Sequence, residues 1–506
     1  MLALPHAYAL NRWADAIRKR ASLTALGGHE ALELPGKVPV IGHTHFFAKH
    51  VDALNDWIAA QSLAYSGRPW RVSVLGQPEL LVLSTPQAME DVTKTQFDNF
   101  PKGEFQCGAL RDLFGDGMIG VDGAKWYAQR KIARHLVTMR ALRDSMTHIV
   151  QKHDPLAGSG PHGHGNVLDL VRLFREFTIE TFAEIAFGIQ MESLGSEQEH
   201  PFHTSMDAIS PLLLLRFRLP SWFWKLQRWL GVGAEGEIAR NMKIVDGILM
   251  NVVGKSLQGR VNGETTKPSS TTDIISLFLD HSGDGDTDHA PLTPTMLRDI
   301  VMVFLVAGRD TSADTLSWFV YMIQQHPRVE AKIRTELDDL FAGKDATSPL
   351  TLEQVGKLVY LEAAIRETLR LYPPAALNTR EASVDTVLSD GTFVRAGTRI
   401  GLSVYSLGRL PSVWGNDASE FKPERWIDPK TRGIISVSPF EFMAFHAGPR
   451  SCMGASIAML EMKLVAAKVL RAFHLDVLPG QDMTQEIGLT LAIKHGLKAR
   501  IRRVEQ

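Results

Sequence analysis

The chain has few cysteines, no excess of charge of either sign and no long apolar run among its 506 residues. Its two cysteines, Cys107 and Cys452, exclude a disulfide framework, because they can form at most one bridge. Lys and Arg total 55 against 56 for Asp and Glu, which argues against a general nucleic-acid binder, since such a protein needs a basic field. With 44% hydrophobic and 22% charged residues, the composition is that of a globular protein.

No segment is apolar enough over its length to predict a membrane-spanning helix. The most apolar continuous run, Ile300 to Gly308, is far shorter than the roughly twenty residues that cross a bilayer. The amino terminus lacks the long apolar region of a signal peptide. Leu10, Trp13 and Ile17 recur there at helical spacing opposite charges, which leaves two interpretations, a membrane-surface segment or a polar leader.

Proline and glycine punctuation suggests where the folded body begins. Residues 35–43, PGKVPVIGH, hold two prolines and two glycines, a composition typical of turns. We therefore expect an N-terminal leader over residues 1–34 and one large domain over residues 35–506.

Periodicity within the body predicts a mainly α fold with a minor β portion. Helical spacing prevails over residues 87–340, and a long helix is expected over residues 295–325, where it ends before Pro327. Strand-like segments lie at residues 71–83, 380–404 and 488–501. Polar residues 254–296 predict a surface loop broken by one short apolar segment at 274–279.

The segment FHAGPRSCMG at residues 445–454 places a cysteine among glycines just before a helical pattern. Gly448 and Gly454 allow the backbone to approach a flat group closely. A helix N-terminus favours a thiolate because its partial charge is positive, and Arg450 adds a nearby cation. A lone cysteine is more often a small buried core residue, but the flanking pattern favours a ligand role for Cys452.

This segment matches the pattern F-x-x-G-x-R-x-C-x-G at Phe445, Gly448, Arg450, Cys452 and Gly454. It resembles the haem-ligand signature of the cytochrome P450 superfamily. The resemblance implies the P450 fold in a single large haem-binding domain, with haem b as cofactor and Cys452 as the axial thiolate of the iron. Such a thiolate pushes electron density onto iron and favours O–O cleavage.

The long helix carries AGRDTS at residues 307–312, which is similar to the oxygen-activation motif of that family. By resemblance, Gly308 would relax the helix to admit dioxygen, and Asp310 and Thr311 would supply a hydrogen bond and a proton. Alone, an Asp-Thr pair on a helix is a weak signal. Some animal members esterify haem through a Glu at the position of Ala307, so the resemblance also implies haem that is not covalently attached through this helix.

Two further motifs follow in the order that the family shows. Glu367 and Arg370 stand at i and i+3, a spacing that usually marks a surface ion pair. Here they match the E-x-x-R pair of the family, and Arg425 in the sequence PERW matches its third member. The resemblance implies that this trio stabilises the fold and retains haem without taking part in catalysis.

Cations are expected to bind the two propionates of the haem, because buried carboxylates need partners. Trp126 and Arg130 match the W-x-x-x-R pattern with which the family clasps a propionate. Arg380 and Arg450 stand where the family places two further propionate partners. Each arginine alone would more often be a solvated charge.

Residues 98–131 and 222–245 resemble fatty-acid and alkane ω-hydroxylases of plants and yeasts. Aliphatic and aromatic residues at 212–224 precede a basic amphipathic segment, which predicts either the roof of an apolar channel in contact with lipid or a buried helix hairpin. We expect hydroxylation of a lipophilic substrate, a fatty acid or alkane at or near its terminal carbon, with sterols, terpenoids and xenobiotics as open alternatives.

Electrons are expected from an NADPH-dependent P450 reductase or another separate donor, because the sequence shows no flavin or iron–sulfur domain. The expected location is the cytosolic face of the endoplasmic reticulum membrane, with contact to the membrane surface and no nucleic-acid partner. Two other classes of haem protein stay as alternatives: a haem-thiolate isomerase or dehydratase, and a haem sensor. The presence of both Asp310 and Thr311 counts against each of them.

Overall fold

The computed structural model describes residues 19–138, 167–191, 193–194, 199–261, 274–281, 292–342 and 350–504. The chain forms two compact units. We call Met1–Gln106, Leu377–Ala418 and Ser438–Ser451 the sheet unit, and Cys107–Ala376, Ser419–Val437 and Cys452–Gln506 the helical unit. The predicted amphipathic segment with Leu10, Trp13 and Ile17 lies outside the described residues.

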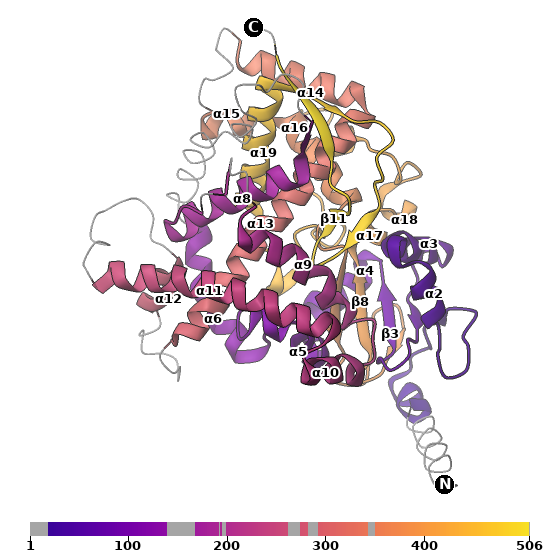
Figure 1. Ribbon diagram of the computed structural model, residues 1–506. Helices are drawn as coiled ribbons and strands as arrows, with labels where there is room; N and C mark the ends of the chain where they lie inside the picture. The colour runs from indigo at the N-terminus through magenta and orange to yellow at the C-terminus, as the bar shows by residue number, and fades with distance from the viewer. Residues whose placement is uncertain are drawn as a thin grey trace. The chain divides into compact units, whose positions relative to one another are not determined.

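A five-stranded mixed sheet is the centre of the sheet unit, in the order β1-β2-β3-β8-β5. Its strands are β1 (Leu32–Glu33), β2 (Trp70–Val72), β3 (Leu80–Leu83), β8 (Arg399–Ser403) and β5 (Leu377–Glu381). β2 and β3 pair antiparallel, which confirms the two strands predicted within residues 71–83. β3 and β8, distant in sequence, pair in parallel and lie side by side (Figure 1). Because β1 already belongs to the sheet, ordered pairing begins before the expected boundary at residue 35.

Short helices and one further strand pair complete the sheet unit. They are α2 (Thr44–Lys49), η1 (Val51–Ala53), α3 (Leu54–Ala64), α4 (Pro86–Glu90), η2 (Asp91–Thr95), η3 (Phe97–Asn99), β6 (Thr386–Val387), β7 (Phe393–Val394), α17 (Val404–Leu407), α18 (Pro411–Trp414) and η7 (Gly448–Arg450). Apolar residues of β3, β8 and α4 share one buried core with Phe440 and Ala447, so the segment before Cys452 is packed onto this sheet.

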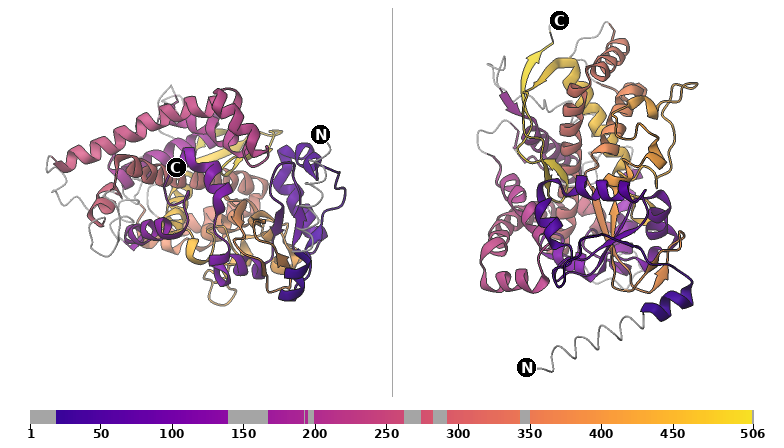
Figure 2. Two further views of the ribbon diagram at one scale, coloured as in Figure 1. Left: turned by 90° about the horizontal axis from the view of Figure 1, so that it is seen from below. Right: turned by 90° about the vertical axis from the view of Figure 1, so that its right-hand side faces the viewer.

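The helical unit is built around the long helix α13 (Pro294–Gln325). Its other helices are α6 (Gly123–Thr138), α8 (Leu170–Phe187), α9 (Pro201–Leu215), α10 (Ser221–Leu230), α11 (Gly233–Val261), α12 (Ile274–His281), α14 (Pro327–Leu340), α15 (Leu352–Lys357), α16 (Val359–Leu371), η6 (Pro423–Trp426) and α19 (Ala455–Ala472), and α5 (Gly103–Phe114) lies mostly within it. Figure 2 shows α11 lengthwise in its left view.

The bounds of α13 follow from residues at its two ends. Thr293 is the N-cap, its hydroxyl oxygen accepts a hydrogen bond from the N–H of Met296, and Pro294 occupies the first turn. At the other end Pro327 cannot continue the helix and begins α14 instead. The predicted helix over residues 295–325 is therefore confirmed.

The surface loop predicted over residues 254–296 is wrong in its described parts. α11 continues to Val261, and residues 274–281 form α12. Ile274, Ile275 and Phe278 of α12 are buried in the core of the helical unit. Their spacing is that of a helix face, and the surrounding Gly, Ser and Thr residues obscured it.

Small sheets account for the remaining strands of the helical unit. β4 (Val167–Asp169), β12 (Lys498–Arg503) and β9 (Phe473–Val477) form an antiparallel sheet in that order, and β10 (Gln485–Ile487) pairs with β11 (Leu491–Ile493). The expected mainly α fold with a minor β portion is confirmed. Among the described residues, no helix is both long and apolar enough to span a bilayer.

Candidate functional site

Cys452 lies at the N-terminal end of α19, in the helical unit. Its Sγ accepts hydrogen bonds from the backbone N–H groups of Gly454 and Ala455 at the start of that helix. The thiol is open on one side and enclosed on the others: the residue is exposed, yet burial by the surrounding chain raises the pKa of its thiol. The two N–H groups and the guanidinium of Arg130 oppose that rise. A metal ion that binds the sulfur displaces the thiol proton, so this setting suits a metal-bound thiolate.

Arg130 and Trp126 both lie on α6, one helical turn apart, and both were predicted from sequence. Trp126 is buried. Burial, with Arg134 nearby, lowers the pKa of Arg130, and the thiol of Cys452 acts in the opposite direction. The structure therefore brings Arg130 close to Cys452 within the helical unit.

Steric contact restricts position 448, in the sheet unit, to glycine. Its φ is +69°, and a Cβ there would lie 1.9 Å from the carbonyl oxygen of Thr93. Any side chain would separate the segment before Cys452 from η2. Phe445, from the same segment, packs edge-on against Phe442.

Arg380, on β5 of the sheet unit, is buried. One terminal nitrogen donates to the carbonyl oxygen of Thr379 at 2.8 Å, and the other lies 3.1 Å from Nε2 of His446. Burial and the charge of Arg380 lower the pKa of His446 to about 3, so this imidazole is neutral and accepts the hydrogen bond. Arg450 belongs to the same unit. The propionate roles of both arginines remain predictions.

α13 is accessible along a single stripe. Between Leu297 and Val320, the residues that are not buried are Phe304, Ala307, Gly308 and Thr311. Their spacing of i, i+3, i+4 and i+7 places them on one face of the helix. The motif predicted for oxygen activation therefore coincides with the open part of an otherwise buried helix.

Gly308 and Thr311 each make a contact that the sequence alone does not predict. α13 is unbroken through Gly308, so the predicted relaxation of the helix is not observed. Instead, a Cβ at Gly308 would lie 2.5 Å from the ring of Phe182, so the glycine permits close packing of α13 on α8. The hydroxyl of Thr311 donates to the carbonyl oxygen of Ala307 at 2.8 Å.

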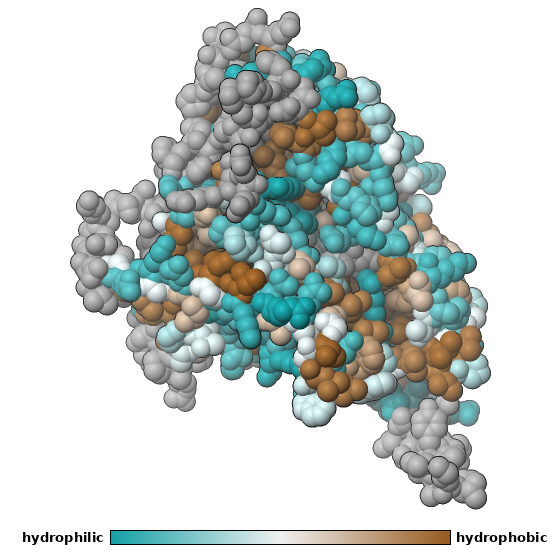
Figure 3. Space-filling model, viewed as in Figure 1, coloured by the Kyte–Doolittle hydropathy of each residue, from teal (hydrophilic) through white to brown (hydrophobic). Residues whose placement is uncertain are grey.

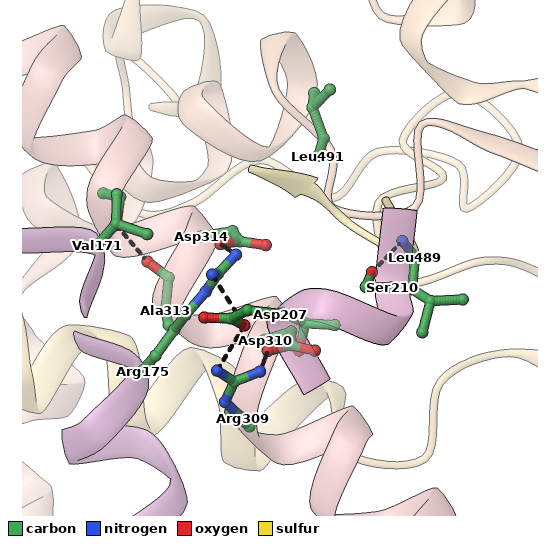
Figure 4. A network of polar contacts seen from close by, with 12 residues as sticks. Val171, Arg175, Asp207, Ser210, Arg309, Asp310, Ala313, Asp314, Leu489 and Leu491 are labelled. Atoms are coloured by element: carbon green, nitrogen blue, oxygen red, sulfur yellow. Dashed lines mark hydrogen bonds and ion pairs between the residues drawn. The ribbon is translucent and has the colours of Figure 1, made fainter. Parts of the chain in front are cut away.

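Asp310 faces away from this stripe and is buried. Its Oδ1 accepts a hydrogen bond from Nη1 of Arg309 at 2.7 Å, within a polar network between α8, α9 and α13 (Figure 4). The two residues expected to act together thus lie on different sides of α13. The sequence analysis did not identify the role of Arg309, because a charged residue on a helix usually faces solvent.

Glu367 on α16 collects five hydrogen bonds. Nε and Nη2 of Arg370, Nε of Arg425, the backbone N–H of Lys422 and the indole N–H of Trp426 all donate to its carboxylate at 2.8–2.9 Å. The side chains of Glu367 and Arg370 are fully buried. The predicted trio is thus assembled, and it includes the indole of Trp426 and the backbone of Lys422, which no charge pattern could have revealed.

A second buried carboxylate, Glu461 of α19, was missed by the sequence analysis. Its side chain is hydrogen-bonded to Ser312 of α13, and Oε1 has no hydrogen-bond partner among the described residues. Burial raises the pKa of Glu461 to about 7. Glu461 lies nine residues after Cys452 and places an ionisable group among buried apolar residues of α19.

Cys107, the other cysteine, lies in a different environment. It is half-buried, and its Sγ is 3.9 Å from Oδ2 of Asp122. A carboxylate neighbour disfavours a thiolate. Cys107 therefore lacks the setting that favours a thiolate ligand.

Comparison with known proteins gives the family. A family model described as Cytochrome P450 matches residues 33–498. The chain is 34% identical over 475 residues to Cytochrome P450 704C1 of Pinus taeda, covering 90% of this chain and 89% of that protein. It is 31% identical to Cytochrome P450 86B1 of Arabidopsis thaliana over 88% of this chain and 80% of that protein. Alkane hydroxylase MAH1 of Arabidopsis thaliana is 29% identical over 86% of each chain.

Removal of the Glu367 carboxylate should unfold this part of the helical unit. In Glu367→Ala, Arg370 and Arg425 lose their buried acceptor, which costs about 3–5 kcal/mol of unfolding free energy. Urea unfolding and the ratio of haem to protein after purification measure the effect. The control, Glu353→Ala, removes an exposed pair with Lys357 and should leave the unfolding free energy almost unchanged, because water screens such a pair. Equal stability of the two variants would show that the Glu367 cluster does not hold the fold.

The buried carboxyl of Glu461 should make stability depend on pH. The folded state keeps this proton to a higher pH than the unfolded chain, so stability is greatest at low pH and falls as the pH rises from about 4.5 to 7. Because Glu461→Gln has no carboxyl group to ionise, its unfolding free energy should lack the decrease of about 3 kcal/mol that wild type shows over that pH range. Unfolding of both proteins at pH 5 and pH 8 measures it, with the exposed Glu237→Gln as control. A constant difference between wild type and Glu461→Gln at the two pH values would contradict the assignment.

Proposed function

The chain belongs to the cytochrome P450 family, and from that premise we propose that it hydroxylates a fatty acid or an alkane at or near the terminal carbon. It is a P450 monooxygenase, and members of this family bind haem b through a cysteine thiolate and receive electrons from a separate redox partner. The observation that carries the proposal is the presence, in one unit, of the Cys452 thiol at a helix N-terminus and of one stripe of α13 that is not buried.

The residues around Cys452 fit a haem. Cys452 would bind the iron, with the N–H groups of Gly454 and Ala455 stabilising the negative charge on sulfur. Trp126 and Arg130 of the helical unit would hold a propionate. The same role for Arg380 and Arg450 rests on their positions in the sequence and on the family resemblance. Haem b bound in this way supplies dioxygen activation and insertion of one oxygen atom into a C–H bond. The absence of a carboxylate at Ala307 leaves no residue there to attach the haem covalently.

The protein's own part is to position the substrate, exclude water and deliver protons. Thr311 presents its hydroxyl on the accessible stripe, where it would hold a proton ready for delivery beside the haem. The carbonyl of Ala307 accepts its hydrogen bond at 2.8 Å and fixes the rotamer. Asp310 would resupply the proton from the opposite side of the helix.

A long apolar substrate is supported by two observations. One relative carries the name alkane hydroxylase. Phe304, Ala307 and Gly308 give the accessible stripe of α13 an apolar surface beside Thr311. An isomerase or dehydratase would need no proton delivery, whereas Asp310 and Thr311 are both present, so monooxygenation remains the favoured chemistry.

Product analysis tests this function. The haem-loaded protein, NADPH and a P450 reductase are incubated with a saturated fatty acid, an alkane and a sterol in separate reactions. We expect terminal or near-terminal alcohols from the fatty acid or the alkane, and a several-fold lower ratio of product to peroxide in Thr311→Ala. Oxidation of the sterol alone would overturn the proposed substrate class. Rearrangement of a fatty-acid hydroperoxide without NADPH would favour the isomerase.

We further propose that α10 binds the membrane surface, at the cytosolic face of the endoplasmic reticulum. Trp222, Leu226 and Trp229 are exposed on one face of α10, and Trp229 is 80% exposed. Figure 3 shows apolar atoms gathered over this helix. α10 contains two basic residues, Lys225 and Arg228, and no acidic one. Arg228 is paired with Asp112, so Lys225 is the cation that suits an anionic lipid surface.

The buried side of α10 is fixed by contacts of Trp224. Trp224 is buried, with the guanidinium of Arg216 4.9 Å from its ring centre. Arg216 in turn donates to both carboxylate oxygens of Glu235 on α11, at 2.8 and 2.6 Å. The apolar face of α10 is therefore presented outward by a buried ion pair.

Vesicle binding tests the α10 surface. Changing Trp222 and Trp229 together to Ser should weaken binding to phosphatidylcholine–phosphatidylserine vesicles at least about tenfold, because each large side chain contributes roughly 1.5–3 kcal/mol when buried. Co-sedimentation measures the affinity. Val384→Ser, at an exposed apolar position of the sheet unit, is the control and should bind as wild type does. Unchanged binding of the double variant would contradict this surface.

A further inference from the structure

The guanidinium of Arg309 has three hydrogen-bond partners in the buried core of the helical unit. Nη1 donates to Oδ1 of Asp310 at 2.7 Å, Nη2 donates to Oδ1 of Asp207 at 2.8 Å, and Nε donates to Nδ1 of His203 at 2.9 Å. Asp207 and His203 both lie on α9, whereas Asp310 follows Arg309 on α13. The planar fork of an arginine can satisfy three such partners in fixed directions, which a lysine cannot do.

His203 is adapted to accept rather than donate. It is buried, and burial together with the charge of Arg309 lowers the pKa of its imidazole to about 2. The ring is therefore neutral, and Nδ1 is available as the acceptor. Its Nε2 has no hydrogen-bond partner among the described residues. The contact with Arg309 is therefore the one hydrogen bond of this imidazole among the described residues.

Asp207 links Arg309 to a second arginine. Arg175 of α8 lies 3.2 Å from Asp207 and 3.4 Å from Asp314, one helical turn beyond Asp310 on α13 (Figure 4). Burial would raise the pKa of Asp207, but the charges of Arg309 and Arg175 outweigh it and lower the pKa. Asp207 therefore carries a negative charge that two buried arginines share.

The main chain of Arg309 is fixed as well. The hydroxyl of Thr178 on α8 donates to the carbonyl oxygen of Arg309 at 2.8 Å. With the backbone held from α8 and the guanidinium held from α9, the Nη1 group that bonds Asp310 has little freedom to move. The position of the Asp310 carboxylate thus depends on residues of a different helix.

We propose that Asp207 and His203 are positioning residues for oxygen activation: they hold Arg309, and Arg309 holds the Asp310 carboxylate in the orientation from which it delivers protons. This inference rests on the proposed monooxygenase function and on the role of Asp310 in it. It makes α9 part of the proton-delivery apparatus, although none of its residues belongs to the AGRDTS motif.

One consequence is reciprocal coupling between α9 and α13. If Asp207 and His203 fix Asp310 through Arg309, then removing the Asp310 carboxylate must also loosen the hold of Arg309 on α9. This effect requires neither substrate nor turnover, so it can be measured even if the substrate class is wrong.

The functional test is a double-mutant cycle on haem-loaded protein. In Asp207→Asn the guanidinium of Arg309 loses a charged partner, and the ratio of peroxide to hydroxylated product should rise about fivefold, the factor given by about 1 kcal/mol. Asp310→Asn should raise the ratio further. The double variant Asp207→Asn/Asp310→Asn should match Asp310→Asn alone, because Asp207 acts through Asp310. Additive effects of the two changes would overturn the proposal.

The matched control is Asp246→Asn. Asp246 of α11 is a partly exposed carboxylate paired with Arg298, a buried arginine of the same helix α13 and about three turns before Arg309. Like Asp207 it is a carboxylate paired with an arginine of α13, and its partner is Arg298 and not Arg309. The control should keep the peroxide ratio of wild type. A rise equal to that of Asp207→Asn would show a general loosening of α13 and would refute the positioning role.

Hydrogen–deuterium exchange without substrate separates this inference from the proposed function. Asp310→Asn should increase exchange in peptides from α9 severalfold, and Asp246→Asn should leave those peptides unchanged. If exchange responds in this way while no substrate is hydroxylated, the coupling stands and the proposed function fails. If the enzyme hydroxylates but α9 exchange is insensitive to Asp310→Asn, the coupling is refuted.

Discussion

The buried carboxylate of Glu367 is the interaction on which the arrangement of the helical unit depends. A carboxylate that is removed from water needs hydrogen-bond donors from the protein. Glu367 accepts five hydrogen bonds, from its own helix α16 and from the segment that contains η6. The same α16 packs against α13, α14 and α19. The cluster therefore ties residues 419–437 to the helices that carry the oxygen motif and Cys452.

Two parts of the helical unit remain available to bind a cofactor and a substrate. They are the N-terminal end of α19 and one side of α13. The start of α19 offers N–H groups to the sulfur of Cys452. Between Leu297 and Val320, α13 is buried except along Phe304, Ala307, Gly308 and Thr311. On its far side the same helix places Asp310 and Arg309 in a network of ion pairs with α8 and α9. A single helix thus separates an apolar, accessible side from a charged, buried one.

The sequence was sufficient for the parts that depend on local pattern or fixed spacing. The caps of α13 and the β2–β3 pair follow from residues that can be read in order along the chain. The Glu367–Arg370–Arg425 trio was predicted from the resemblance to the motifs of the family, because spacing alone indicates a surface ion pair. The sequence was insufficient where the reason lies in another segment. A side chain at position 308 would clash with Phe182, and one at position 448 would clash with Thr93. Arg309 is buried because Asp207 and His203 accept hydrogen bonds from its guanidinium. α12 was missed since its short apolar run is flanked by loop-like residues.

The central claim is that Cys452 is the thiolate ligand of the haem iron, and the carbon monoxide difference spectrum of the reduced protein tests it most directly. Wild type and Cys107→Ser should both show the red-shifted band of a thiolate-ligated haem, because Cys107 lies beside Asp122 and has no part in ligation. Cys452→Ser should lose that band, since a serine hydroxyl cannot supply a thiolate. Loss of the band in Cys107→Ser, or its persistence in Cys452→Ser, would contradict the account.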